Sequence, residues 1–134
     1  MNSRFQTGLP DDVASTLDAM AEAEAWNWLN VYKFALWLGL VAVEDKGGLR
    51  NAEAALGSGL PETAGGWRSV KVPRDARNLV DMAKREGVQW RRAQRIALLA
   101  GFKTIENRGG LNATKAQVEA LRRSVVSQIM GRAP

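Results

Sequence analysis

The sequence predicts a mainly helical protein that contains two copies of one small unit in tandem, each with a short β-hairpin. An internal repeat is the first observation: residues 26–49 align without gaps with residues 88–111, and eight of the 24 aligned positions are identical. The second is that apolar residues recur at helical spacing in both halves. The third is a Gly-Gly-Leu sequence at the end of each aligned stretch, which predicts a tight turn.

The repeat defines two expected domains, residues 1–62 and residues 63–134, with the glycine-rich segment 57–67 as their boundary. It also bears on residues 26–43, which are apolar enough to suggest a short membrane span. The aligned stretch of the second copy contains Arg91, Arg92 and Arg95, which a spanning helix does not tolerate. We therefore expect residues 26–43 to form a buried helix followed by a strand, and a membrane-active role for this segment is a third, less favoured hypothesis.

In the second copy, Pro73 and Asp75 are typical of a helix start, and Gly87 is typical of a helix end. A second helix is expected from Gln89 to Ala100, ended by Gly101. Residues 102–111 then predict a hairpin around the turn 107–110, because asparagine and glycine there accept positive φ values. A last amphipathic helix is expected over residues 114–130.

These elements and their residues resemble the winged helix-turn-helix superfamily. The resemblance lies in MAKREGVQWRRAQRIALLAGF (82–102) and in IALLAGFKTIENRGGLNATKAQVEAL (96–121), and the first copy matches it more loosely. It implies two tandem winged helices, in which the helix from Gln89 would be the recognition helix. Winged helices serve DNA, RNA and protein binding alike, so the resemblance alone leaves the function open.

The two halves differ in net charge. Residues 1–62 carry a net charge of −5 and residues 63–134 carry +10, within a total of +5. Such a field attracts polyanions to one half and disfavours them at the other. We therefore expect the second copy to bind double-stranded DNA.

The expected DNA-binding side chains fall into three groups. The recognition helix supplies Gln89, Arg91, Arg92, Gln94 and Arg95, which match guanine or adenine edges and phosphates. The wing supplies Lys103 and Arg108, and the first helix supplies Arg74 and Arg77. Lys71, Arg122 and Arg123 are further phosphate-contact candidates. The alternative is that these cations form only a solvated helix face.

The first copy lacks this basic helix and is rich in tryptophan. Packing in the core is the simpler role for its aromatic residues, but Trp26, Tyr32 and Trp37 also suggest an exposed patch for a protein partner. An acidic copy that meets a basic copy also permits head-to-tail self-association.

Catalysis is not expected. The chain has no cysteine and no histidine, which excludes thiolate and imidazole chemistry and the usual zinc or haem ligands. The repeated Glu44 and Glu106 suggest either a pair of acid/base carboxylates or two ordinary turn residues that pair with Lys46 and Arg108, and the second interpretation is favoured because no nucleophile or phosphate loop accompanies them. We expect no catalytic residue, metal or cofactor, and a cytoplasmic location because the first residues do not suit a signal peptide.

The leading hypothesis is a small non-enzymatic DNA-binding protein, either a regulator or a packaging or partition factor, that uses its basic second copy. The alternative is a protein–protein adaptor, or a virus-encoded assembly or inhibitory protein, built from the same tandem units.

Overall fold

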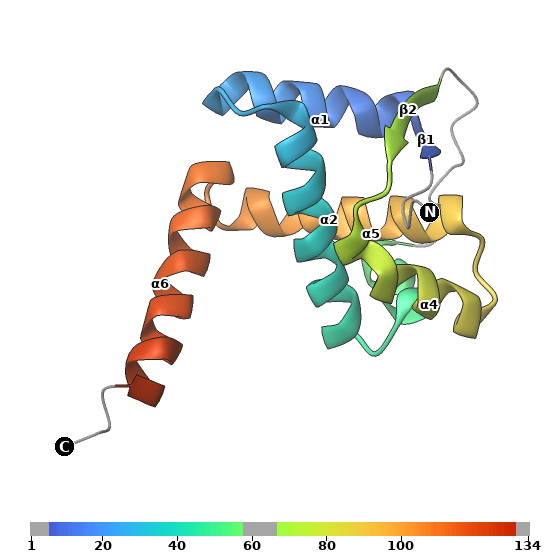
Figure 1. The fold of residues 1–134 in the computed structure, drawn as a ribbon. Coiled ribbons are helices and arrows are strands. Elements are labelled where there is room, and N and C mark those ends of the chain that lie inside the picture. The colour runs from blue at the N-terminus through green and yellow to red at the C-terminus, as the bar shows by residue number, and fades with distance from the viewer. Residues whose placement is uncertain (1–5, 58–66, 131–134) are drawn as a thin grey trace.

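The computed structural model describes residues 6–57 and 67–130, which form helices and two short strands (Figure 1). The prediction of a mainly helical protein is confirmed. In chain order the elements are β1 (Gln6–Pro10), α1 (Asp11–Glu24), α2 (Trp28–Asp45), α3 (Leu49–Leu56), β2 (Trp67–Lys71), the 3₁₀ turn η1 (Arg74–Ala76), α4 (Arg77–Glu86), α5 (Trp90–Asn107) and α6 (Leu111–Met130).

The two halves repeat one order of elements, a strand followed by three helices, and they join through their strands. β1 and β2 pair antiparallel, with Gln6 opposite Lys71 and Gly8 opposite Ser69. Leu9 and Val70 are buried, so one face of this two-stranded ribbon covers the core. Because side chains alternate along a strand, positions 6, 8, 69 and 71 belong to the other face, which we call the outer face. The ribbon lies at one edge of the molecule, near the start of α1 (Figure 1).

Helices α2 and α5 cross at the centre of the molecule (Figure 1), where two glycines allow their backbones to touch. A Cβ atom on Gly39 would lie 1.7 Å from the carbonyl oxygen of Ala97, and one on Gly101 would lie 2.0 Å from that of Ala35. Gly101 was expected to end its helix, which is wrong: it lies inside α5. Its sequence signal reflects close packing rather than helix termination.

One hydrophobic core serves both halves. Leu17 and Val31 of the first half share it with Leu79, Ile96 and other residues of the second. The two halves therefore bury their apolar faces against each other. The expected boundary segment lies largely in residues 58–66, outside the described residues, so the linker itself has no structural account.

The expected hairpins do not form, because the chain is helical at both places. Residues 40–44 lie in α2 and residues 102–106 lie in α5. Short apolar runs suit a strand and a buried helix equally well, which explains the error. The glycine pairs end helices instead: the N–H of Gly48 donates to the carbonyl of Val43 at 3.0 Å, and that of Gly110 donates to Ile105 at 2.9 Å. This is the bonding of a helix C-terminus with glycine in the left-handed region.

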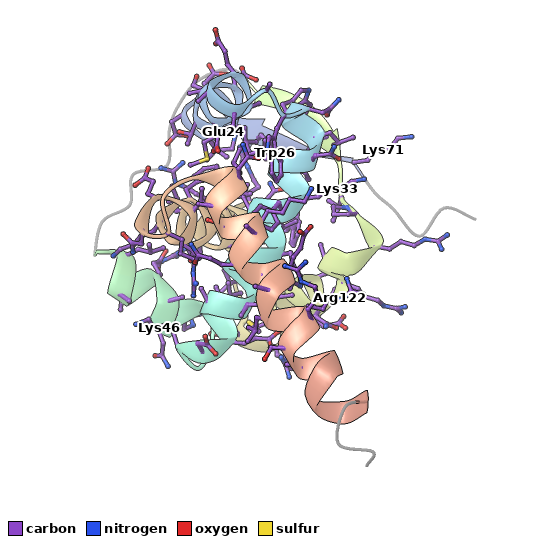
Figure 2. All side chains as sticks on the ribbon, turned by 90° about the vertical axis from the view of Figure 1, so that its left-hand side faces the viewer. Glu24, Trp26, Lys33, Lys46, Lys71 and Arg122 are labelled. Carbon is purple, nitrogen blue, oxygen red and sulfur yellow. The ribbon has the colours of Figure 1, made fainter. Side chains whose placement is uncertain are left out.

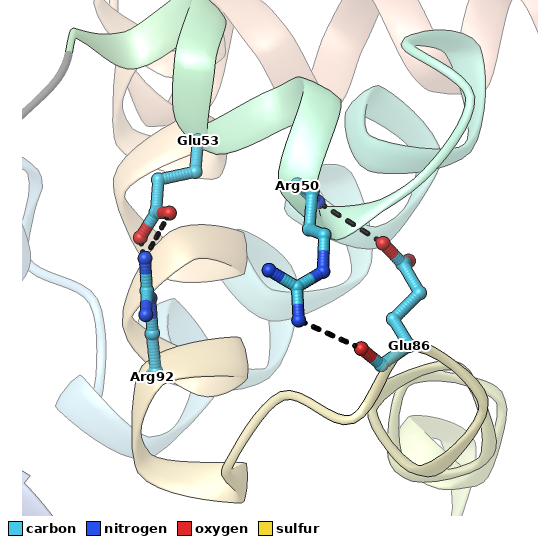
Figure 3. A network of polar contacts seen from close by, with 4 residues as sticks. All are labelled: Arg50, Glu53, Glu86 and Arg92. Carbon is cyan, nitrogen blue, oxygen red and sulfur yellow. Dashed lines mark hydrogen bonds and ion pairs between the residues drawn. The ribbon is translucent and has the colours of Figure 1, made fainter.

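Each half also caps a helix of the other. Glu86, at the end of α4, accepts from the backbone N–H of Leu49 at 2.7 Å. It also accepts from the backbone N–H of Arg50 at 3.1 Å (Figure 3). Glu24, at the end of α1, likewise accepts from the backbone N–H groups of Leu111 and Asn112. Glu24 and Glu86 are equivalent in the repeat, so the two caps are exchanged reciprocally. Each carboxylate satisfies backbone donors that the first turn of a helix leaves unpaired.

The structure also tests the predicted helix ends and the possible membrane span. Gly87 ends α4 in the left-handed conformation, as predicted. The final helix begins at Leu111, three residues earlier than expected. Both strands were missed. Among the described residues, no helix has the length and hydropathy needed to cross a membrane.

Candidate nucleic-acid interface

A basic surface adjoins the ribbon where β2 leads into the helical part of the second half. We call Lys71, Arg74, Arg77 and Lys84 the basic face; all four are exposed. Arg74, Arg77 and Lys84 line one surface hollow together with Val72, Pro73, Val80 and Asp81. Lys71 ends β2 and extends outward at the upper right of Figure 2, on the ribbon face opposite the core. The chain thus places one exposed cation at the end of the outer face of the ribbon and three more on the segment that follows it.

Lys33 of α2 extends this surface from the first half. It lines a neighbouring hollow with Pro73 and Ala76, so it lies against η1 of the second half. Figure 2 shows Lys33 and Lys71 toward the same side of the molecule. The positive field beside the ribbon is therefore built mostly, but not wholly, by the second half.

The arginines of the expected recognition helix are instead committed to contacts with the first half. Arg92 forms an ion pair with Glu53 of α3 (Figure 3). This hydrogen bond lowers the pKa of the Glu53 carboxyl below its usual value. Arg95 pairs with Asp12 of α1 at 2.7 Å, and only 11 % of its side chain is exposed. A groove contact by these two side chains would first require both ion pairs to break.

Gln94 and Tyr32 are corrections to the expected sites, since both are buried in the core. The Tyr32 hydroxyl donates to Oε1 of Gln94 at 2.8 Å, and Nε2 of Gln94 points to the carbonyl of Gly8 at 3.4 Å. Gln94 is thus turned toward the inside of the molecule and does not present itself to an adenine edge. Burial raises the pKa of the Tyr32 hydroxyl well above its usual value. Tyr32 is part of the interior rather than of an exposed aromatic patch.

The other predicted cations are exposed but scattered. Lys103 lines a hollow with Lys46 near the C-terminal ends of α5 and α2, and Figure 2 shows Lys46 on the side away from Lys71. Arg108 follows α5 and donates to Gln117 of α6 at 2.9 Å. Gln89 and Arg91 are exposed at the start of α5, and Arg122 and Arg123 are exposed on α6. Of the predicted DNA-binding residues, Arg74 and Arg77 line one hollow, and Lys71 precedes them by a few residues along the chain. Sequence reasoning missed Lys84, although its spacing of two helical turns from Arg77 predicts a shared face.

Two tryptophans of the first half, Trp26 and Trp37, form a row of aromatic rings with Phe34 of α2 between them. The rings of Trp26 and Phe34 have centroids 5.6 Å apart, and those of Phe34 and Trp37 are 6.3 Å apart. Trp26 is partly buried, and its indole N–H donates to Asn112 of α6 at 2.8 Å. Trp37 is 44 % exposed, beside Val41 at 43 %. Only the Trp37 end of the predicted aromatic patch is open.

The structure offers little for metal or acid/base chemistry. Among residues 6–57 and 67–130, acidic side chains do not gather into a group of three that a metal ion needs. Glu44 and Glu106 are exposed near the C-terminal ends of α2 and α5, so they are helix residues rather than strand residues.

Comparison of the chain with protein-family models, with curated proteins and with solved structures gives no match. The function is therefore inferred from the surfaces that the described residues present.

Proposed function

We propose that this protein is a non-enzymatic binder of double-stranded DNA that inserts the β1–β2 ribbon into the major groove. The major groove accommodates a two-stranded β-ribbon as well as a helix. The basic face then lies where it can bind the phosphates at the rim of the groove. The observation that carries the proposal is that Lys71 is exposed at the end of β2 and that Arg74, Arg77 and Lys84, which follow it along the chain, share one surface hollow.

The architecture supports this mode of binding. In several DNA-binding proteins a β-ribbon reads the groove, and dimeric readers match the twofold symmetry of their sites. Here one strand comes from each half of an internal repeat, so a single chain supplies what two subunits otherwise supply. Leu9 and Val70 hold the core-facing side of the ribbon, and Lys71, at the end of the opposite face, is exposed.

The ribbon is favoured over α5 as the reading element. The winged-helix hypothesis required the start of α5 to enter the groove. Gln94 is buried there, and Arg92 and Arg95 are engaged with acidic residues of the first half. A buried hydrogen-bonded side chain is costly to extract, since its partner would lose its own hydrogen bond.

The first test is fluorescence anisotropy of a labelled duplex across a salt series. We expect the observed affinity to fall steeply with salt, by about 0.9 in log–log slope for each phosphate contacted. The triple variant Lys71→Ala/Arg74→Ala/Arg77→Ala should bind at least about tenfold more weakly and show a shallower slope. The matched control is Lys46→Ala/Lys103→Ala, which removes two exposed lysines that line a separate hollow. Absence of binding at low salt, or equal losses in variant and control, would contradict the proposal.

Competition separates a regulator from a packaging or partition factor. A sequence-specific regulator prefers its site over random duplex by about 10³-fold or more, whereas a packaging protein has a small ratio. Selection from a randomised duplex pool, followed by competition with bulk DNA, measures this ratio directly.

A second candidate is a protein-docking role in an adaptor or an assembly. One observation favours it: Leu29, Trp37 and Val41 are exposed apolar residues that recur along α2. Self-association is the form that can be tested without a known partner. If this stripe joins copies of the chain, sedimentation equilibrium should show dimers that the variant Trp37→Ala/Val41→Ala loses. A monomeric wild-type protein would exclude self-association through α2.

A further inference from the structure

Equivalent positions on the first helical segment after each strand differ in charge between the two halves. Arg74 corresponds to Asp11, Arg77 to Ser15 and Lys84 to Glu22, if the second half is one residue shorter at its 3₁₀ turn than the first half is at the start of α1. All six of these side chains are exposed. The fold thus presents the same surface twice, once with three cations and once with two carboxylates and a hydroxyl group.

We propose that DNA is held on one side of the ribbon only, and that the preferred duplex site is therefore not palindromic. This inference rests on the DNA binding proposed above. A symmetric ribbon protein binds a palindrome because each half meets equivalent phosphates and bases. Here a duplex centred on the ribbon would bring phosphates close to Asp11 and Glu22 on one side. Repulsion there and attraction at the basic face both shift the duplex toward the second half.

The first half has little with which to offset this repulsion. Its described cations are Lys33, Lys46 and Arg50. Lys33 lies against η1 of the second half, so it adds to the same side as the basic face. Arg50 donates to the backbone carbonyl of Glu86 at 3.0 Å (Figure 3), and Lys46 lies at the far end of α2. The asymmetry is therefore a property of the whole described surface of the first half and not of one acidic residue.

The two strands add a second source of asymmetry. On the outer face, the register places Gln6 and Gly8 of β1 opposite Lys71 and Ser69 of β2. Lys71 is an exposed hydrogen-bond donor, whereas Gly8 has no side chain that could contact a base. The sequence read by β2 should therefore differ from that read by β1.

Site-directed cleavage of DNA tests this geometry on duplexes of any sequence. The chain has no cysteine, so single-cysteine variants can carry an iron–EDTA cleavage reagent at one chosen place. Ala19→Cys and Asp81→Cys are matched positions, both exposed, on α1 and α4. Cleavage is compared at saturating protein, so that a difference in affinity does not contribute. We expect several-fold more cleavage from the conjugate at position 81 than from that at position 19.

The charge-reversed protein Asp11→Arg/Glu22→Lys supplies the second measurement. It should raise cleavage from position 19 toward that from position 81 and steepen the salt dependence of binding. Equal cleavage from the two positions in the wild-type background would overturn the one-sided geometry while leaving DNA binding intact. Unchanged cleavage from position 19 after charge reversal would also overturn it. Failure of the unmodified protein to bind duplex in the anisotropy assay would refute the proposed function itself.

Discussion

The two halves of this protein make equivalent contacts in the interior but carry different charges on the surface. Gly39 and Gly101 make the same close approach, and Glu24 and Glu86 make the same cap on the opposite half. The exposed faces of α1 and α4, in contrast, differ in charge. Packing and capping restrict which residues a position accepts, whereas solvent does not. The comparison therefore separates what the shared fold requires from what a ligand would select.

The third helices of the halves differ in another way. α3 has 8 residues and packs against α5, whereas α6 has 20 residues and extends away from the body (Figure 1). Leu121 and Val125 of α6 are exposed. The caps show that both helices start in equivalent places, so the difference lies only beyond their first turns.

The largest effect is expected from filling the helix crossing. Gly39→Ala and Gly101→Ala should each destabilise the protein by about 3 kcal/mol or more, because the added methyl group meets a backbone carbonyl that cannot move aside. Urea unfolding followed by circular dichroism measures the change. Val41→Ala, at an exposed position of α2 near Gly39, is the control and should change stability by less than about 0.5 kcal/mol. If only one of the two substitutions caused a large loss of stability, the two close approaches would not be equivalent.

Loss of either reciprocal cap should cost less. Glu24→Ala and Glu86→Ala each leave two backbone N–H groups without their carboxylate, for an expected loss of about 1–2 kcal/mol. The neutral variants Glu24→Gln and Glu86→Gln keep an acceptor and should lose less. Glu106→Ala, which removes an exposed carboxylate from α5, is the comparison variant. Unequal losses in the same unfolding assay would show that one cap is dispensable.

A smaller effect on stability should appear at alkaline pH, and it comes from Tyr32 of the first half. Burial raises the pKa of Tyr32 in the folded state, so folding favours the neutral phenol. Its contribution is fully present below the unfolded pKa of about 10 and is lost as pH rises above that value. Stability should therefore fall at alkaline pH in the wild type and fall less in Tyr32→Phe. Parallel curves for the two proteins, from urea titrations at several pH values, would contradict this assignment.

The smallest effect is expected from the ion pair between the halves at Arg92. The hydrogen bond from Arg92 lowers the pKa of Glu53, so its stabilisation is present above the usual glutamate pKa and is lost as pH falls through the acid range. Arg92 is exposed and Glu53 is partly exposed, so solvent screens the pair and we expect about 0.5 kcal/mol or less. Glu53→Gln should reduce stability at neutral pH and have no effect in acid. A constant difference across the pH range would show that the charge of Glu53 is not responsible.

Sequence reasoning was sufficient for some of the fold and for little of the site. The repeat, the helix end at Gly87 and the location of Arg74 and Arg77 on an exposed surface followed from local pattern. The glycine pairs were misinterpreted because a positive φ suits a hairpin turn and a helix C-terminus alike. Val70 of β2 and Val72 just after it alternate with polar residues before Pro73, a weak strand signal, but β1 has only Leu9 as an apolar residue of that kind. β1 is a strand because it pairs with β2.

The errors at the site have one physical cause. The partners of Arg92, Gln94 and Arg95 are Glu53, Tyr32 and Asp12, all from the other half of the chain. A helical wheel of α5 shows which side chains share a face, but not which distant residue faces them. Long-range pairing decides whether a charged residue is offered to solvent or is already engaged.

Because the strands and caps join two halves of one chain, the ribbon should not dissociate when the protein is diluted. When two separate subunits build a ribbon, it dissociates at low concentration, and its stability cannot be separated from the amount of protein present. Here β1 and β2 are always at a high effective concentration relative to each other, because a single chain carries both. The ribbon should thus persist at copy numbers of a few molecules per cell. Each half can also acquire substitutions that the other does not share, which a protein made of identical subunits cannot do.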